Sequence, residues 1–187
     1  MHMFQKILIG MVFGIFFTSM SDAGEWDEAE KQIVRLGPTR FSELPRNIFD
    51  ELKARGCRIP QAYGFDKPHN VIKGEFAAKY QQDWAVLCSK GGSSEILIFW
   101  GGPVRCSSGL RKRQDQHWLQ VVATGKIGYS RAISTVGSDQ ILSYYEAFGG
   151  PVPPPIKHEG IDDAFVGKAS VIHYCNQGKW IELKGMD

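Results

Sequence analysis

Residues 70–103 constrain the fold of this chain more than any other stretch. Three runs rich in Val, Ile, Leu, Phe and Trp (NVIKGEF, DWAVLCS and SEILIFW) are separated by polar or glycine-containing breaks. Short runs of β-branched and aromatic residues between turn residues predict a three-stranded antiparallel meander. In DWAVLCS the residues on both faces are apolar, so this strand is expected to be central and covered on both sides. Lys90-Gly91-Gly92-Ser93 predicts a hairpin turn, because glycine reaches positive φ easily.

Two helices are predicted outside the meander. Pro45 suits a first turn, and an apolar face at helical spacing follows it, so a helix is expected over 45–55, ended by Gly56. A second helix is expected over 139–148, with Ser138 as its cap. A thinner apolar stripe over 25–36 predicts a short third helix.

The remaining strands are expected to extend the meander into one sheet. Residues 117–123 read as a strand, and 169–184 read as a hairpin that turns at 176–178. Residues 101–116 are polar and predict a long surface loop, and 125–136 suggest a short strand pair around Gly128. Since strands and helices do not alternate regularly, the predicted fold class is α+β, a mostly antiparallel sheet packed by two or three helices in one disulfide-stabilised domain.

The first 23 residues have the features of a signal peptide. Lys6 precedes an uncharged apolar run over 7–17, which is too short to span a bilayer, and Ser21 and Ala23 occupy the small-residue positions of a cleavage site before Gly24. An uncleaved N-terminal anchor is the alternative. The expected mature product is a single domain, 24–187, that is periplasmic or secreted and leaves the membrane after cleavage.

The charge of the chain argues against nucleic acid or an anionic membrane as a partner. It has 22 basic and 20 acidic residues, a net charge of +2. Its one basic cluster, Arg111-Lys112-Arg113, is interpreted as part of a solvated loop.

The cysteines, Cys57, Cys88, Cys106 and Cys175, are even in number, which in an exported chain favours disulfides. Four cysteines allow three connectivities. We favour Cys57–Cys88 with Cys106–Cys175, because the first bridge would tie the helix over 45–55 to a core strand. Their spacing does not match a zinc site.

Two resemblances accompany these patterns. Gly74-Glu75-Phe76 followed by Asp83-Trp84-Ala85-Val86 resembles one FG-GAP hairpin of a β-propeller, and it implies local hairpin geometry only, since a propeller needs at least four blades. The stretches GC-x-IPQ, NVIKGEF…Q-x-DWAVLCS, GGP-x-PPPI and GIDDAF…KAS…GKWI-x-L-x-G together resemble a group of exported bacterial proteins without an assigned activity. That resemblance implies one compact exported domain.

The motifs of common enzymes are missing from the sequence. There is no G-x-S-x-G, no H-E-x-x-H and no phosphate-binding loop ahead of a helix, and no cofactor is expected. A His–Asp pair from His117 or His173 with Asp83 or Asp163 could still assemble in space. For Asp83 and His173 the structural interpretation is hydrogen bonding within the sheet.

Residues 157–163 suggest a calcium site as a further hypothesis. Glu159, Asp162 and Asp163 surround a glycine turn, but Lys157 stands where the first carboxylate belongs. The alternative is an acidic turn before a strand.

Aromatic residues give the remaining hint of a binding surface. Trp100 precedes Gly101-Gly102, and rings left exposed beside these glycines or beside Gly149-Gly150 would form a recognition surface for an extracytoplasmic protein or a carbohydrate. The leading functional hypothesis is therefore a non-catalytic exported binding or inhibitor-like module. A small exported hydrolase with a spatially assembled His/Asp site is the alternative, and a structural part of an envelope complex is the third.

Overall fold

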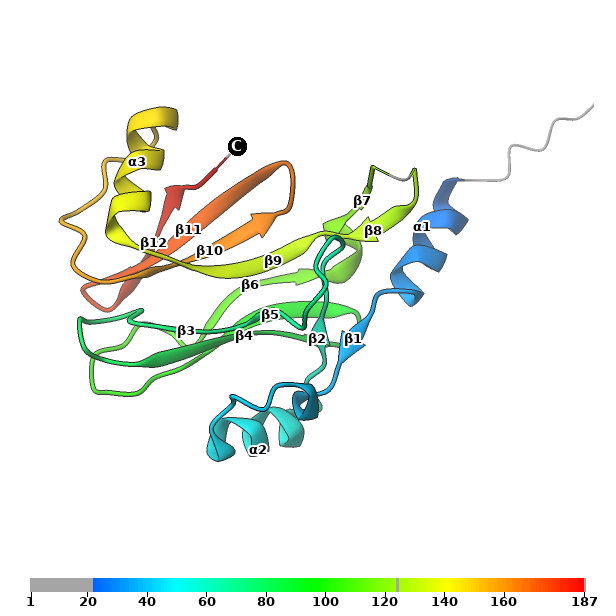
Figure 1. Ribbon diagram of the computed structural model, residues 1–187, viewed down its shortest axis with the longest axis horizontal. Helices are drawn as coiled ribbons and strands as arrows, with labels where there is room; N and C mark the ends of the chain where they lie inside the picture. The colour runs from blue at the N-terminus through cyan, green and yellow to red at the C-terminus, as the bar shows by residue number, and fades with distance from the viewer. Residues whose placement is uncertain (1–21, 124, 187) are drawn as a thin grey trace, which may run out of the picture.

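The computed structural model describes residues 22–123 and 125–186 and shows an α+β protein built around two antiparallel sheets (Figure 1). The helices are α1 (Asp22–Lys31), α2 (Arg46–Arg55) and α3 (Ser138–Phe148), with short 3-10 helices η1 (Pro38–Arg40) and η2 (Asp115–Trp118). The strands are β1 (Arg35–Leu36), β2 (Ile59–Pro60), β3 (Val71–Gly74), β4 (Asp83–Lys90), β5 (Ser93–Phe99), β6 (Gly109–Gln114), β7 (Leu119–Val121), β8 (Ile127–Tyr129), β9 (Arg131–Val136), β10 (Gly160–Phe165), β11 (Ala169–Asn176) and β12 (Lys179–Lys184).

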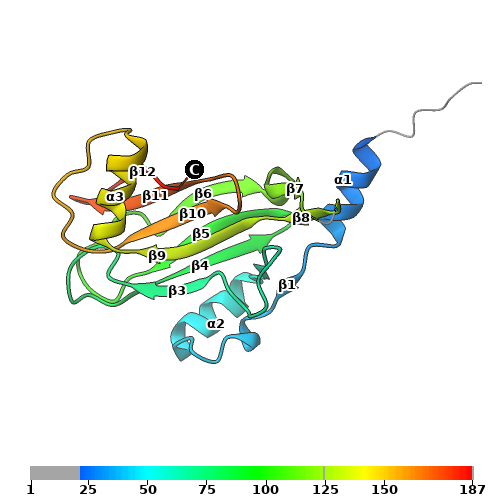
Figure 2. The same ribbon diagram turned by 45° about the horizontal axis from the view of Figure 1, so that its top comes forward.

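The two main sheets face each other and each carries a helix on its outer side. The first sheet has the order β3-β4-β5-β6 and the second the order β12-β11-β10-β9; β1-β2 and β7-β8 form two small pairs. In Figure 1, α2 lies against the first sheet and α3 against the second, so the layers run helix, sheet, sheet, helix. Figure 2 shows α1 beside the β7–β8 pair, at the end of the molecule opposite α3.

Apolar residues fill each interface between layers. Between the sheets, Leu87 and Ile96 of the first sheet pack with Ile133 and Ile161 of the second. Outside the first sheet, Val86 and Leu97 pack with α2, and outside the second, Val136, Ile172 and Leu183 pack with Ile141 of α3. Alternate residues of β4 therefore enter different cores, which explains why the DWAVLCS run is apolar throughout.

The predicted meander and the predicted α2 are confirmed. β3, β4 and β5 pair in sequence, and Gly91 and Gly92 form the β4–β5 turn with φ of 59° and 74°. Gly56 ends α2 in the left-handed conformation, and its N–H donates to the carbonyl oxygens of Leu52 and Lys53. The C-terminal hairpin is confirmed as β11 and β12, with a turn at Gln177-Gly178.

The prediction of one sheet is wrong, because the C-terminal hairpin joins β9 and β10 in a sheet of its own. Of the strand predicted over 117–123, Leu119–Val121 is confirmed as β7, and η2 precedes it. Among the described residues β7 pairs with β8 and does not join the meander. Conversely, the loop predicted over 101–116 contains β6, the edge strand of the first sheet. Leu110 is the one buried residue of β6, so this strand has no alternating apolar pattern to reveal it.

The basic cluster lies in β6 and not in a loop. The register between β5 and β6 shifts between Ser94 and Ile96, and Arg111 has a positive φ of 51°. Arg111 and Arg113 line the same cleft, described below, while Lys112 does not line it.

The N-terminal helix is shorter than predicted and begins earlier. α1 ends at Lys31, and Arg35–Leu36 pairs with β2 instead of continuing the helix to residue 36. Trp26 and Ile33 anchor this segment against Trp118 and Tyr129. The predicted signal peptide, 1–23, lies outside the described residues except for its last two positions, which open α1.

Both disulfides have the favoured pairing. Cys57–Cys88 joins the end of α2 to β4, and Cys106–Cys175 joins the loop after β5 to β11 and so links the two sheets. In the described ranges, 22–123 and 125–186, we find no helix with the length and apolar character needed to cross a membrane.

Candidate functional site

Half of the outer face of the second sheet is left open. α3 covers Val136, Ile172 and Leu183, and the other half of this face is a pocket of about 420 Å³. Outward-facing residues of β9, β10 and β11 form its floor: Ala132, Ser134, Asp162, Ala164 and Ser170. The loop after β2, the β10–β11 turn and Met186 form its walls. We call this cavity the outer pocket.

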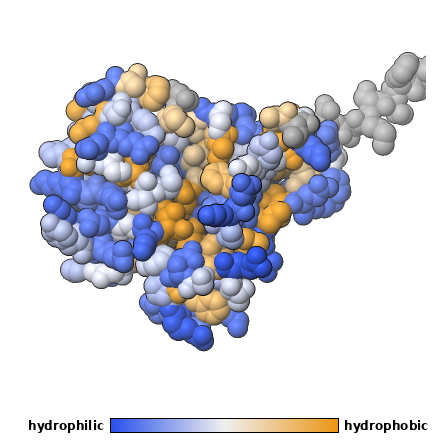
Figure 3. All heavy atoms as spheres, in the orientation of Figure 1, coloured by the Kyte–Doolittle hydropathy of each residue, from blue (hydrophilic) through white to orange (hydrophobic). Residues whose placement is uncertain are grey.

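The outer pocket has the size and lining of a ligand site. Pockets for small molecules typically measure about 300–1,000 Å³ and are mostly apolar with a few polar groups. Phe65 and Phe165 line it together with alanines and Val166. Figure 3 shows apolar residues in the middle of the molecule, where β9 and β10 pass beside the loop after β2.

Asp162 is the acidic group of the outer pocket. Burial raises the pKa of Asp162, and the neighbouring Asp163 raises it further, while Ser170 and His173 act in the opposite direction. Within the described chain, Asp162 Oδ1 is buried and has no hydrogen-bond partner. An acceptor in this state is ready to receive a donor from a ligand.

His69 belongs to the wall and not to a catalytic pair. Its Nε2 accepts from the Ala62 N–H at 2.8 Å, and its Nδ1 lies 3.2 Å from the Lys67 carbonyl oxygen, to which it donates in the neutral form. Burial lowers the pKa of His69. Its ring stacks on Phe65 at a centroid distance of 4.1 Å. Both ring nitrogens are therefore engaged with the backbone, and the ring holds the loop in place.

A fully buried ion cluster lies on the opposite, inward face of β10. Arg131 donates from Nε and Nη2 to the two carboxylate oxygens of Asp163 at 2.8 and 2.9 Å, and from Nη1 to Ser94. The guanidinium also lies 4.4 Å from the ring centre of Trp118. Burial alone would raise the pKa of Asp163, but His173 and Arg131 more than offset it and lower that pKa.

One His–Asp pairing suggested by the sequence is brought together in this cluster. His173 Nε2 lies 3.8 Å from Asp163 Oδ2, which is too long for a hydrogen bond. The two residues are only 1% and 2% exposed, and Arg131 occupies both oxygens of Asp163. His117 is exposed at the protein surface. The arrangement offers no accessible general base at the His173–Asp163 pair.

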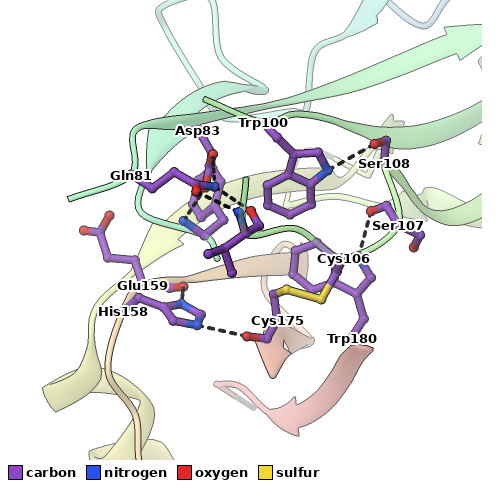
Figure 4. Close-up of a disulfide and its surroundings, with 12 residues drawn as sticks. Gln81, Asp83, Trp100, Cys106, Ser107, Ser108, His158, Glu159, Cys175 and Trp180 are labelled. Atoms are coloured by element: carbon purple, nitrogen blue, oxygen red, sulfur yellow. Dashed lines mark hydrogen bonds between the residues drawn. A yellow bond between two sulfur atoms is a disulfide. The ribbon is translucent and has the colours of Figure 1, made fainter. Parts of the chain in front are cut away.

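Asp83 holds the turn that precedes β4, as the structural interpretation expected (Figure 4). Its carboxylate accepts from the N–H groups of Phe76 and Gly101 at 3.1 and 2.8 Å and from the Gln81 amide at 2.9 Å. All of these bonds stabilise the segment around the Cys106–Cys175 bridge.

Trp100, which belongs to the predicted recognition surface, has partners within the protein itself. Trp100 and Trp180 stack at 5.8 Å beside the Cys106–Cys175 bridge, and their indole N–H groups donate to Ser108 and Ser107 (Figure 4).

The four glycines named with Trp100 do not share a surface. A side chain at Gly101 or Gly102 would collide with Gln82 or Gln81, so these glycines permit close packing. Gly149 ends α3, and Gly150 packs against Lys184. The two glycine pairs have different neighbours, so they do not form one cleft.

The three calcium candidates take separate partners. Glu159 accepts from the Glu75 N–H at 2.8 Å, Asp163 binds Arg131, and Asp162 lines the outer pocket. Among residues 22–123 and 125–186, no group of three or more His, Cys, Asp or Glu side chains could hold a metal ion.

The sequence patterns did not predict most residues of the outer pocket as parts of a binding site. Asp162 was identified only as a metal candidate, and Phe65 and Ala164 were not identified at all. One pattern in the sequence could have indicated the pocket: every second residue of β10 is small or polar, and so are Ala132 and Ser134 of β9. The face formed by these residues has no large side chains that would fill the space above it.

We expect Asp162→Asn to raise the melting temperature at pH 7. A carboxyl whose pKa is raised on folding binds its proton more tightly in the folded state. Its contribution to stability is therefore greatest below the unfolded pKa and falls as pH rises toward the folded pKa. At neutral pH the ionised Asp162 is destabilising, and asparagine removes that effect. A gain of a few degrees is expected, since 1 kcal/mol shifts the melting temperature of such a domain by roughly 2–4 °C.

Calorimetry at pH 7 and pH 3.5 checks this prediction. The gain should shrink at the lower pH, where Asp162 is protonated. Asp66→Asn, in the exposed loop nearby, serves as the control and should not change the melting temperature. A loss of stability in Asp162→Asn at pH 7 would show that its carboxylate is favourably bonded in the free protein.

Comparison of the chain with protein-family models, with curated proteins and with solved structures finds no match.

Proposed function

We propose that this protein is an exported, non-catalytic binding module of an inhibitor-like kind, and that its outer pocket receives an apolar side chain of an extracytoplasmic protein partner. The observation that carries the proposal is the largely apolar pocket on the half of the second sheet that α3 leaves uncovered. In its floor, Asp162 Oδ1 has no hydrogen-bond partner among the described residues. A backbone or side-chain N–H of the partner would supply the missing donor.

The lining of the outer pocket favours a protein over a carbohydrate. A sugar carries hydroxyl groups around its ring and needs many polar partners, each of which costs free energy if it is buried unbonded. The polar side chains of the outer pocket are Ser134, Asp162, Lys168, Ser170 and His69, and both ring nitrogens of His69 are already engaged with the backbone. An aliphatic or aromatic side chain gains about 1.5–3 kcal/mol on full burial and needs no such partners.

The surface next to the outer pocket extends this contact. Phe65 lines both the outer pocket and a neighbouring hollow of about 510 Å³, and Val34 and Tyr63 at that hollow are exposed. Exposed apolar groups that adjoin one another are typical of protein interfaces. A partner would place one anchor in the outer pocket and cover this rim.

Export is supported by the two disulfides and by the signal-peptide features of residues 1–23. Disulfides form and persist in oxidising compartments.

The rival hydrolase hypothesis has the His173–Asp163 approach in its favour, but both groups are buried beneath the sheet surface.

Blocked amino acids test the proposal directly. In ¹H–¹⁵N NMR titrations, N-acetyl-phenylalaninamide and N-acetyl-leucinamide are expected to shift the amide signals of Ala132, Ala164 and Gly167 saturably, at millimolar affinity. Ala164→Trp, which fills the pocket, should abolish the shifts. Val121→Trp, on exposed β7, is the matched control and should preserve them. Shifts with methyl glucoside alone would favour a carbohydrate partner, and the lack of any response would contradict the proposal.

Capture from an envelope extract then tests for the partner itself. A protein enriched by the wild-type chain and by Val121→Trp, but not by Ala164→Trp, is the expected result. Equal enrichment by all three baits would place the contact elsewhere.

A further inference from the structure

We infer that the protein has a second binding site, at one open end of the sandwich, for a small organic ligand that carries a carboxylate or similar anionic group next to an apolar ring or chain. This site adjoins the outer pocket, with which it shares Phe165, Ala169 and Ser170, but its basic residues do not line the outer pocket. The inference does not depend on the proposed function.

The site is a cleft of about 360 Å³ between the two sheets, which we call the end cleft. Its basic residues come from β6 and η2: Arg111, Arg113 and His117. Its apolar residues are Trp118 of η2, Phe165 of β10 and Val171 of β11. A ligand there would touch both halves of the sandwich.

The end cleft has more positive than negative charge. Among the described residues, Asp163 is the only acidic one that lines the end cleft, and Arg131 already neutralises it through two short hydrogen bonds. Arg111 lies 3.4 Å from Glu182, which is exposed, so solvent weakens this pair. In the described part of the chain the Arg113 side chain makes no ion pair. An anion would therefore find an uncompensated guanidinium.

Two buried N–H donors lie among the residues that line the end cleft. Trp118 is 7% exposed, and its Nε1 has no hydrogen-bond partner among the residues that the structure describes. Arg111 Nε is likewise without one, although Asp163 lies 3.5 Å away. Buried donors without acceptors are destabilising. An anionic group in the end cleft brings several acceptor oxygens to the wall that carries both donors.

The apolar wall specifies the rest of the ligand. Trp118 and Phe165 meet edge to face at 5.7 Å and 74°, and Arg131 covers one side of the Trp118 ring. Phe165 is half-buried, so part of its side chain remains accessible in the cleft. A ring or short aliphatic chain would cover the accessible part of Phe165, whereas inorganic phosphate would leave this apolar surface exposed to solvent.

Three small compounds with the same phenyl ring and different polar groups test the inference. Titration with benzoate is expected to shift the Trp118 indole signal and the Arg113 and Phe165 amide signals saturably, in the millimolar range for a ligand of this size. Benzyl alcohol and benzylamine, which keep the ring without the negative charge, should bind at least tenfold more weakly. Raising the salt from 0.05 to 0.5 M should weaken benzoate binding, since the ligand is held partly by charge.

Two charge reversals on β6 distinguish binding at the end cleft from a general attraction of benzoate to the positive charge of the protein. Arg113→Glu should weaken benzoate binding at least tenfold. Lys112→Glu makes the same change in charge one residue away, on an exposed side chain that does not line the end cleft. This control should alter the affinity for benzoate less than threefold. Both positions are exposed, and unchanged NMR spectra would show that the variants fold. Ala164→Trp should leave benzoate binding intact.

Several outcomes would overturn the inference. Equal effects of the two reversals would mean that overall charge alone attracts benzoate. Equal affinity for benzyl alcohol would remove the role of the anion, and equal affinity for inorganic phosphate at the same signals would remove the role of the apolar wall. A lack of saturable shifts with benzoate would dismiss the site.

Discussion

Replacing Arg131 by methionine is expected to lower the free energy of unfolding by about 3–5 kcal/mol. Arg131 and Asp163 are buried between the sheets, and the substitution removes the bidentate partner of the Asp163 carboxylate, which keeps only the longer 3.5 Å contact with Arg111 among the described arginines. The guanidinium also bonds Ser94 and the Arg111 carbonyl oxygen, so those acceptors lose a donor too. Urea unfolding monitored by tryptophan fluorescence measures the loss.

A double-mutant cycle shows how much of this loss belongs to the pair. Asp163→Leu alone should also be strongly destabilising, because it leaves the arginine uncompensated. Arg131→Met combined with Asp163→Leu should cost clearly less than the sum of the single variants, since the pair is then replaced by apolar groups. Additive losses would mean that the two residues stabilise the fold independently.

The Arg131→Met defect should also depend on pH. In the wild-type protein the pKa of Asp163 is lowered on folding, so its contribution to stability is present above the unfolded pKa and is lost as pH falls through the folded pKa. Without Arg131, burial favours the protonated carboxyl. The difference in stability between wild type and variant should therefore be larger at pH 7 than at pH 3.5. A defect of equal size at both values would assign it to packing.

Removing the Cys106–Cys175 bridge is expected to cost about 4 kcal/mol. The two cysteines are 69 residues apart, and cross-linking a chain of that length restricts the unfolded state strongly in the chain-entropy model. The measurement is urea unfolding of Cys106→Ala/Cys175→Ala, where alanine avoids a buried hydroxyl. The bridge also joins the two sheets directly, so the variant should lose protection from amide hydrogen exchange across β11 and β12 first.

The other bridge provides the comparison. Cys57 and Cys88 are 31 residues apart, so the same model gives their bridge about 0.7 kcal/mol less. Cys57→Ala/Cys88→Ala should therefore be slightly more stable than the first variant. An unchanged unfolding midpoint in either variant would show that the bridge adds nothing to a fold already fixed by packing.

Local signals in the sequence were sufficient for the central elements. Gly91-Gly92 between two apolar runs defined the β4–β5 hairpin, and Pro45 and Gly56 bounded α2 within one residue. The cysteine pairing followed from where α2 and β4 were expected. The hairpin, the helix and the Cys57–Cys88 bridge depend on patterns close together in the chain, and Cys106–Cys175, 69 residues apart, followed as the remaining pair.

The division into two sheets and the pocket could not be predicted in this way. Arg131 looks like an ordinary polar strand residue until Asp163, 32 positions later, meets it in the interior. The open half of the second sheet depends on how far α3 extends over it, which no local pattern encodes. The sequence placed Asp162 near a possible ligand but assigned it a metal, because the neighbouring glycine and carboxylates resemble a calcium loop.

The sequential order of the two bridges has a consequence for biogenesis. Each bridge links a cysteine to the next cysteine along the polypeptide. All strands of the second sheet follow Cys88 in the sequence, so the first bridge can close before they are synthesised. An oxidase that joins thiols in their order of emergence would make the native pairs without correction. Maturation of this protein should accordingly proceed at a normal yield in cells that lack a disulfide isomerase.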